Sequence, residues 1–236
     1  MLKLLRDLIR AEPSGEEDRL LPEGMLITGQ AGLVSGTRVA TDRGWRPVEA
    51  LRVGDRVLGF DRGFQPVIDV QRDHLSLGEE RRPGGCRALR VPPRALGNQA
   101  PLWLMPDQGL LLESEAAQAI LGEAFVVVPA RALSGQRRIA EAEVGPELDS
   151  VTLVFPQEEA IYVEGGLLAL CPRPQTPLAA VDAAEEPGYF RVQTLQTARF
   201  LVRDLIEGGG AAALGYAPEE IAPQVAAAQR GPRLAG

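Results

Sequence analysis

The sequence predicts a mainly β protein with strongly bent antiparallel sheets and helical extensions at both ends. The 19 prolines and 26 glycines in 236 residues are more turn-forming residues than a helical bundle accommodates. Short runs rich in branched and aromatic residues recur between residues 25 and 172, as expected of strands. Turn-forming clusters such as Asp42-Arg43-Gly44 and Asp61-Arg62-Gly63 separate these runs.

Composition divides the chain into three predicted parts. Residues 1–24 hold a short amphipathic helix followed by a polar linker, and residues 25–172 hold the strands and one helix at 113–122. Residues 173–236 begin with a stretch rich in proline and alanine. A helix at 195–206 follows and ends at a glycine run, and a weaker helix is expected near 218–230.

The terminal helices are the predicted contacts with other proteins. In residues 1–10 four apolar side chains lie at helical spacing, with charged side chains opposite them: Leu2, Leu5, Leu8 and Ile9 against Lys3, Arg6, Asp7 and Arg10. So short a helix is marginal in water, and we expect it to dock on protein rather than on a membrane surface. The helix at 195–206 either packs on the β-domain or on the N-terminal helix, or binds a partner protein. The oligomeric state is left open.

Several function classes are excluded by composition. A net charge of −7 argues against nucleic acid as a partner, because phosphate binding requires a basic face. No apolar run approaches the roughly 20 residues that span a bilayer, and no signal peptide is evident, so we expect a cytoplasmic protein; unconventional secretion stays open. One histidine and two separate cysteines indicate neither a metal site nor a cofactor, and a disulfide between Cys86 and Cys171 is an open alternative.

Four blocks carry a resemblance to a known family. In order along the chain they are GTRVAT (36–41), RPVEALRVGDRVL (46–58), ALGN (95–98) and IYVEG (161–165). Together they resemble the Hint (Hedgehog/intein) domain, in its bacterial branch outside the true inteins. The resemblance implies a horseshoe-like all-β fold that cleaves its own chain. In active members a Cys or Ser at the start of the domain attacks the preceding peptide carbonyl. A Thr and a His in a later block assist, and protonate the departing nitrogen.

This chain departs from that pattern at the catalytic positions. The nucleophile position is Gly32, which has no side chain to attack with. The Thr-x-x-His block reads Met105-Pro106-Asp107-Gln108, so Met105 replaces the Thr and Gln108 replaces the His. A glutamine does not exchange protons near neutral pH, which removes the general acid and base.

The later blocks depart as well. Where relatives have a His after a strand, this chain reads Phe155-Pro156-Gln157-Glu158, and Ala169-Leu170 stand in place of the His-Asn pair that closes an intein. The single asparagine, Asn98, lies in mid-chain and argues against splicing by terminal Asn cyclisation.

The sequence therefore favours a catalytically inactive Hint-like domain that acts as a structural or protein-interaction module in a larger assembly. The alternative is an autoproteolytic domain that cleaves near Ala31-Gly32 with a variant nucleophile. Ser35 is the weak candidate for it, although its use puts Gly36-Thr37 out of register. A third class is a β-domain that binds a small ligand in the vacated cleft lined by Gly32, Met105 and Gln108.

The remaining candidates have structural interpretations. Their polar or small side chains are typical of turns, solvated loops and strand ends, which explain them more simply than a catalytic or binding role does. We expect His74 in a solvated turn, Glu158 and Glu159 in a solvated loop with a cation site as the alternative, Asp55 in a backbone turn, Cys86 at the start of a strand, and Cys171 at the buried end of the last strand.

Overall fold

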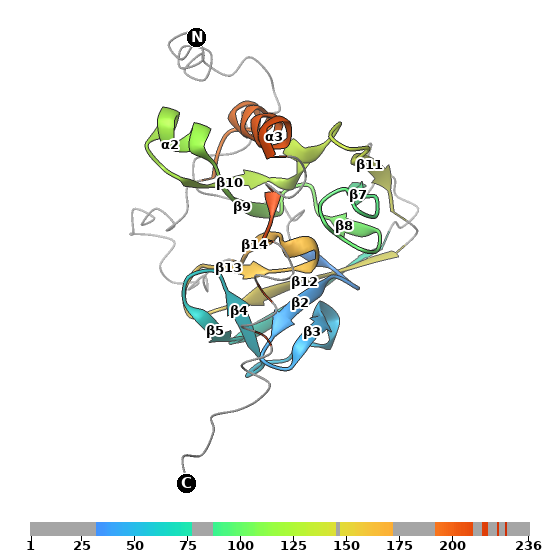
Figure 1. Cartoon of the computed structure of the whole chain (residues 1–236). Helices are drawn as coiled ribbons and strands as arrows, with labels where there is room; N and C mark the ends of the chain where they lie inside the picture. The colour runs from blue at the N-terminus through green and yellow to red at the C-terminus, as the bar shows by residue number, and fades with distance from the viewer. Residues whose placement is uncertain are drawn as a thin grey trace, which may run out of the picture.

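Two antiparallel sheets form the framework of the part of the chain that the structure describes (Figure 1). The structure is a computed structural model, and it describes residues 32–76, 87–144, 147–171, 192–209, 214–216, 221 and 225. Helices α2 and α3 lie together at one end, next to β9 and β10 (Figure 1). The predicted mainly β class is confirmed.

The first sheet has six strands and is built around two long, paired neighbours. The residues of β6 and β12 pair antiparallel from Asp69 opposite Val154 to Ser76 opposite Glu147. The strand order is β11 (Ala140–Glu143), β7 (Arg87–Val91), β8 (Leu102–Leu104), β1 (Leu33–Val34), β12 (Glu147–Val154) and β6 (Asp69–Ser76).

The second sheet has eight strands, of which β5 (Gly63–Pro66) pairs with β4 outside the main order. Its central strands are almost wholly apolar and buried, as expected of strands covered on both faces. The order is β10 (Phe125–Pro129), β9 (Gly109–Glu113), β14 (Leu168–Cys171), β13 (Glu159–Tyr162), β4 (Arg56–Gly59), β2 (Arg38–Thr41) and β3 (Gly44–Pro47). Three 3-10 turns lie at Val48–Ala50 (η2), Ala130–Leu133 (η3) and Glu164–Gly166 (η4).

One large apolar cluster joins the two sheets to the C-terminal helix. It includes Leu89 and Leu104 from the first sheet, Val39 and Leu110 from the second, and Val202 from α3, all buried. The burial of this much apolar surface is the main stabilising term of the fold.

Helix α2 (Glu115–Leu121) forms where the sequence predicts a helix at 113–122. The Ser114 side chain caps it by accepting a hydrogen bond from the Ala117 N–H at 3.1 Å, and Gly122 ends it in the left-handed conformation. Its buried residue, Ala117, packs with Val126 of β10 and Leu201 of α3.

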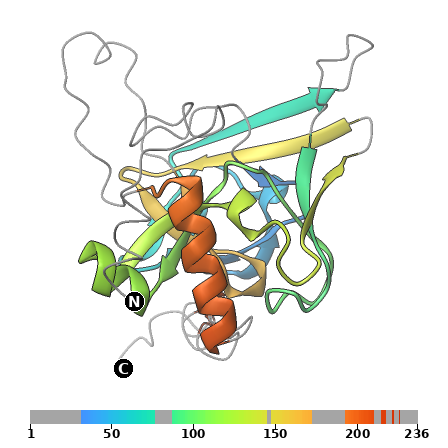
Figure 2. The same cartoon turned by 90° about the horizontal axis from the view of Figure 1, so that it is seen from above.

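Helix α3 (Leu195–Gly209) lies against the β-domain (Figure 2). Its buried face consists of Leu195, Ala198, Leu201 and Val202. The residues before it are tied to the second sheet, because the Gln193 N–H donates to the Val127 carbonyl at 2.8 Å. The predicted packing of this segment on the β-domain is observed.

The chain makes another close contact with the domain at residues 214–216. The Tyr216 N–H donates to the Gly166 carbonyl of η4 at 2.9 Å. A Cβ at Gly166 would lie 1.8 Å from the Tyr216 carbonyl oxygen, so only glycine fits there. The contact places residues beyond the predicted boundary at 172 against the β-domain.

Some predicted features fall outside the described residues. They are the helix at 1–10, a strand at 25–28, Cys86, and most of the helix near 218–230. None of the helices in the described ranges is both long and apolar enough to cross a bilayer.

We expect α3 to contribute to the stability of the whole domain. Leu201→Ala leaves a cavity between α2, α3 and β10, and such changes lower the free energy of unfolding by about 2–5 kcal/mol. Arg199→Ala, on the exposed face of α3, is the matched control and is expected to change it by less than about 0.5 kcal/mol. Urea unfolding of the full chain measures both. Equal effects of the two variants would show that α3 is an independent appendage.

Candidate functional site

The side chain of Gln108 connects three separate parts of the fold. It lies in the turn between β8 and β9 and is buried, with 3% of its surface exposed. Its Oε1 atom accepts the Gly32 N–H at 3.0 Å, and its Nε2 atom donates to the carbonyls of Gly109 at 3.0 Å and Leu170 at 2.9 Å. If the amide were flipped, its NH2 group would face the Gly32 N–H and its oxygen would face the two carbonyls. These partners therefore determine the orientation of the amide.

Gly32 lies immediately before β1, close to two hydroxyl groups of β12. A Cβ at this position would be 3.2 Å from Thr152 Oγ1 and 3.6 Å from Ser150 Oγ. The φ angle of Gly32 is +115°, which side chains other than glycine's rarely adopt. The structure thus brings the predicted nucleophile position, Gly32, into direct contact with the predicted His position, Gln108.

The Met105 side chain takes no part in these hydrogen bonds, although its carbonyl accepts the Gln108 N–H at 3.1 Å. It is fully buried and packs with Val34 of β1 and Leu148 of β12. It has therefore become part of the apolar core, where its thioether neither donates nor exchanges a proton.

Asp107 is held in the same turn by Arg131. The two side chains form an ion pair, and the backbone N–H of Arg131 donates to the Pro106 carbonyl at 2.9 Å. The Ala130 N–H in turn donates to the Gln108 carbonyl at 2.9 Å. These bonds from η3 fix the backbone that aims the Gln108 side chain.

Ser35 is not part of the site. It is half-buried after the last residue of β1, and its N–H donates to the Asp149 carbonyl at 2.9 Å. Three residues of extended chain put it about 10 Å from Gly32. The hydroxyls nearest to Gly32 are instead those of Ser150 and Thr152, which the sequence analysis did not single out.

The third predicted block packs around Arg62. Phe155 is fully buried, while the Arg62 guanidinium bonds the Gln157 side chain, the Glu158 carbonyl at 2.9 Å, and Glu159 Oε1 at 3.2 Å. The expectation of a solvated loop is wrong for Glu159. It is the first residue of β13 and only 2% exposed, because strand pairing carries it into the domain.

The second carboxylate oxygen of Glu159 has no hydrogen-bond partner. It lies against Gly59 of β4, where a Cβ would be 2.6 Å away. Cys171 of β14 is the register partner of Glu159. Burial is the main cause that raises the pKa of Glu159, Arg62 opposes it, and Asp61 adds to it. Burial, and secondarily Glu159, raise the pKa of the Cys171 thiol.

The Hint domain family model matches residues 31–168 of the chain. The chain belongs to the Hint domain family. The resemblance inferred from the four sequence blocks is thereby confirmed. No curated protein matches the chain.

Solved structures similar to this Hint domain include three intein-related proteins. A splice-inactive, GSH-linked variant of the AceL NrdHF class 3 split intein is 13% identical, with 61% of this chain and 99% of that chain covered and a TM-score of 0.41. A bacterial intein-like domain from Clostridium thermocellum is 12% identical, with 61% and 99% covered and a TM-score of 0.41. The MchDnaB-1 intein is 18% identical, with 58% and 98% covered and a TM-score of 0.33.

The other singled-out residues of the Hint domain are structural. His74 is not in a turn as expected. It lies on β6, because the strand continues through this polar stretch, and its Nδ1 atom is 2.6 Å from Asp149 Oδ1 in an exposed pair. Asp55 forms the expected turn by accepting the Arg52 N–H at 2.9 Å. Asn98 bonds three backbone groups of its own loop, and Cys171 is the buried, free end of β14.

Metal ligands do not converge in the Hint domain. No three His, Cys, Asp or Glu side chains cluster at metal-binding distance within the residues that the structure describes. Glu158 and Glu159 diverge, the first bonding through its backbone and the second buried beside Arg62.

Gln108→Leu is expected to destabilise the Hint domain. The change keeps the side-chain volume but leaves the buried Gly32 N–H and Leu170 carbonyl without their partner, and each such loss costs about 1–3 kcal/mol. Urea unfolding should show a fall of about 2–4 kcal/mol in the free energy of unfolding. Gln99→Leu, in an exposed loop, is the control and should have little effect. A fall no larger than the control's would refute the bridging role.

Glu159→Gln is expected to change how stability depends on pH. Since the folded-state pKa of Glu159 is raised, wild type loses stability as pH rises from 4.5 through that raised value, and the variant does not. In that window the free energy of unfolding of the variant should rise, relative to that of wild type, by at most about 1.4 kcal/mol per pH unit. Urea unfolding at a series of pH values measures it, with the exposed Glu123→Gln as control. A pH-independent difference would contradict the assignment.

Proposed function

We propose that this Hint domain does not cleave its own chain and acts as a structural or protein-interaction module within a larger assembly. The observation that carries this proposal is the contact between Gln108 Oε1 and the Gly32 N–H. Cleavage of the bond before Gly32 would release this nitrogen as an amine, which needs a proton. An amide oxygen that accepts a hydrogen bond from that nitrogen supplies none.

The predicted residues also supply neither the nucleophile nor the assisting hydroxyl that cleavage requires. Gly32 carries no nucleophile, and Met105 is packed into the core. Because Gly32, Met105 and Gln108 are all buried and Gln108 is fully bonded, they also offer little to the small-ligand alternative. A domain so closed at its former catalytic positions is suited to being a stable scaffold.

The partner surface that we propose is the exposed side of α3 together with the N-terminal segment. The apolar face of α3 is used inside the domain, which leaves Gln196, Arg199, Arg203 and Glu207 for a partner. A partner of α3 would therefore be recognised through charge and hydrogen bonds rather than through an apolar stripe.

Autoproteolysis near Ala31-Gly32 is the second candidate, and one observation favours it. The hydroxyls of Ser150 and Thr152 lie beside Gly32, so a variant nucleophile is available from β12. Attack on the Ala31 carbonyl would form an ester and break the bond to the Gly32 nitrogen. The proton for that nitrogen is the missing component.

Intact mass spectrometry distinguishes the two candidates. After long incubation with and without a thiol or hydroxylamine, we expect one species at 25.3 kDa. Gly32→Cys should also stay intact, because Gln108 still supplies no proton and the positive φ at Gly32 strains any side chain. Gly32→Ala carries the same backbone strain without a thiol and is its control.

A fragment that begins near Gly32 or Ser35 would overturn the inactive assignment. In that case Ser150→Ala, Thr152→Ala and Ser35→Ala identify the nucleophile, since only loss of the attacking hydroxyl abolishes the fragment.

A further inference from the structure

Three arginines in two turns at one end of the first sheet have a left-handed backbone. Among the residues that the structure describes, the non-glycine residues with a positive φ are Arg94 (66°), Arg137 (44°) and Arg138 (65°). Arg94 follows β7, and the other two precede β11, the strand that pairs with β7 at the edge of the sheet (Figure 1). A side chain with a Cβ makes this conformation costly, and residues that adopt it are common at binding sites.

The turn before β11 has arginine where other residues would be more favourable. The Ile139 N–H donates to the Gln136 carbonyl at 2.6 Å and closes a β-turn. Arg137 and Arg138 are its two central residues, and both have a positive φ, which is the pattern of a type I′ turn. Glycine, asparagine and aspartate are the residues that usually occupy these positions, because they adopt a positive φ at less cost.

Arg94 occupies an equivalent position in the turn after β7. The Ala95 N–H donates to the Pro92 carbonyl at 3.2 Å, so Pro93 and Arg94 are the central residues of that turn. Proline followed by a residue of positive φ is the pattern of a type II turn, in which the second central residue is usually glycine. The local preference of the backbone therefore explains arginine at none of the three positions, whereas a role for the side chains explains all three.

A fourth arginine lies beside these turns. Arg90 is exposed on β7, directly opposite Ala140 of β11. Arg138 lies two residues before Ala140 and Arg94 lies four residues after Arg90, so these side chains project from the same end of the β7–β11 pair. We define Arg90, Arg94, Arg137 and Arg138, all of them exposed, as the arginine cluster. Within the described ranges, none of its guanidinium groups has a hydrogen bond or an ion pair.

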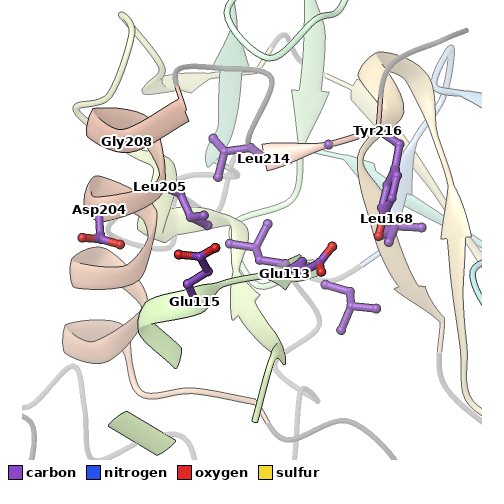
Figure 3. A pocket seen from close by; sticks show the side chains of 11 residues that line it. Glu113, Glu115, Leu168, Asp204, Leu205, Gly208, Leu214 and Tyr216 are labelled. Atoms are coloured by element: carbon purple, nitrogen blue, oxygen red, sulfur yellow. The ribbon is translucent and has the colours of Figure 1, made fainter. Parts of the chain in front are cut away.

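The nearby acidic side chains do not neutralise the arginine cluster. Glu141 of β11 pairs at 3.4 Å with Arg87, at the opposite end of β7. The exposed carboxylates of Glu113, Glu115 and Asp204 line a groove between α3 and β9 (Figure 3), and none of them forms an ion pair with the cluster. Unpaired positive charges close together repel one another, so an anionic occupant is favoured.

The spacing of the charges indicates a row of carboxylates as the occupant. Arg90 and Arg94 are at most about 14 Å apart along the chain, which is the length of about four residues of an extended peptide. The planar guanidinium group binds a carboxylate through two parallel hydrogen bonds. The net charge of −7 repels a phosphate backbone over the rest of the surface, which favours an acidic protein segment over a nucleic acid.

We propose that the arginine cluster binds an extended, carboxylate-rich segment of a partner protein. Two closed turns hold Arg94, Arg137 and Arg138, so less conformational freedom is lost on binding than from arginines in a flexible loop. This surface is separate from the one proposed on α3. The proposal holds whether or not the Hint domain cleaves itself.

Binding of a synthetic, fluorescently labelled octaglutamate peptide to the full chain tests the proposal by fluorescence anisotropy. Wild type should bind the peptide, and more weakly as salt is raised. Arg137→Asn with Arg138→Gly should weaken binding about tenfold, from two lost arginine–carboxylate contacts. Urea unfolding of this variant should show a free energy of unfolding at least equal to that of wild type, because asparagine and glycine suit a type I′ turn.

Arg43→Gln with Arg52→Gln is the matched control. It removes the same charge from two exposed loops of the second sheet and should weaken binding less than about twofold, because salt screens remote charges. An equal loss in this control, or no binding of octaglutamate to wild type, overturns the proposal. Tighter binding of an octathymidylate oligonucleotide than of octaglutamate at the same salt concentration overturns it in favour of a nucleic acid.

Discussion

A buried amide side chain adds hydrogen bonds between the two sheets of this Hint domain to the apolar cluster that joins them. Gln108 accepts a hydrogen bond from Gly32, which leads into β1 of the first sheet, and donates one to Leu170, which lies in β14 of the second. The amide supplies one acceptor and two donors, and the three partners use all of them in a direction that the geometry fixes. The neutral side chain performs this role at every pH at which the domain is folded, whereas an imidazole there would titrate.

Glu159 is also a buried polar side chain, but unlike Gln108 it does not have all of its hydrogen-bonding capacity satisfied. Its charge is balanced by Arg62 on one oxygen only, and the other oxygen faces Gly59 and the strand that carries Cys171. Burial of a half-paired carboxylate costs free energy, which the raised pKa expresses. The glycine at 59 is required by this close approach. The Gln157 side chain and the Glu158 carbonyl hold the Arg62 guanidinium so that it faces the carboxylate.

The sequence predicted the parts of the fold that local signals determine. The Ser114 cap and Gly122 delimit α2, and apolar runs mark most of the central strands. The sequence analysis missed β1, β3, β5 and β11. The first three are only two to four residues long, and β11 alternates alanine with glutamate, a weak strand former.

The candidate site was predictable only in part, for a physical reason. The block spacing of the family located Gly32 and Gln108, and the structure brings these two together. Three features depend on pairing between distant strands, which no local pattern encodes. These are the burial of Glu159, the position of His74 on a strand, and the hydroxyls of Ser150 and Thr152 beside Gly32. Arg62 and Glu158 are 96 residues apart in the sequence, so no local signal indicated that Glu159 is buried beside Arg62.

Met105 and Gln108 have structural roles at positions that the family resemblance predicts to be catalytic. Active sites keep polar groups unsatisfied and backbones strained, at a cost in stability. In this domain Met105 adds to the apolar core beside Val34 and Leu148, and Gln108 satisfies backbone groups that would otherwise be buried without partners. Both residues therefore strengthen the packing and the hydrogen bonding around β1 and β14. The proposed role as a scaffold accords with this rigidity, because a satisfied and closely packed site costs no stability.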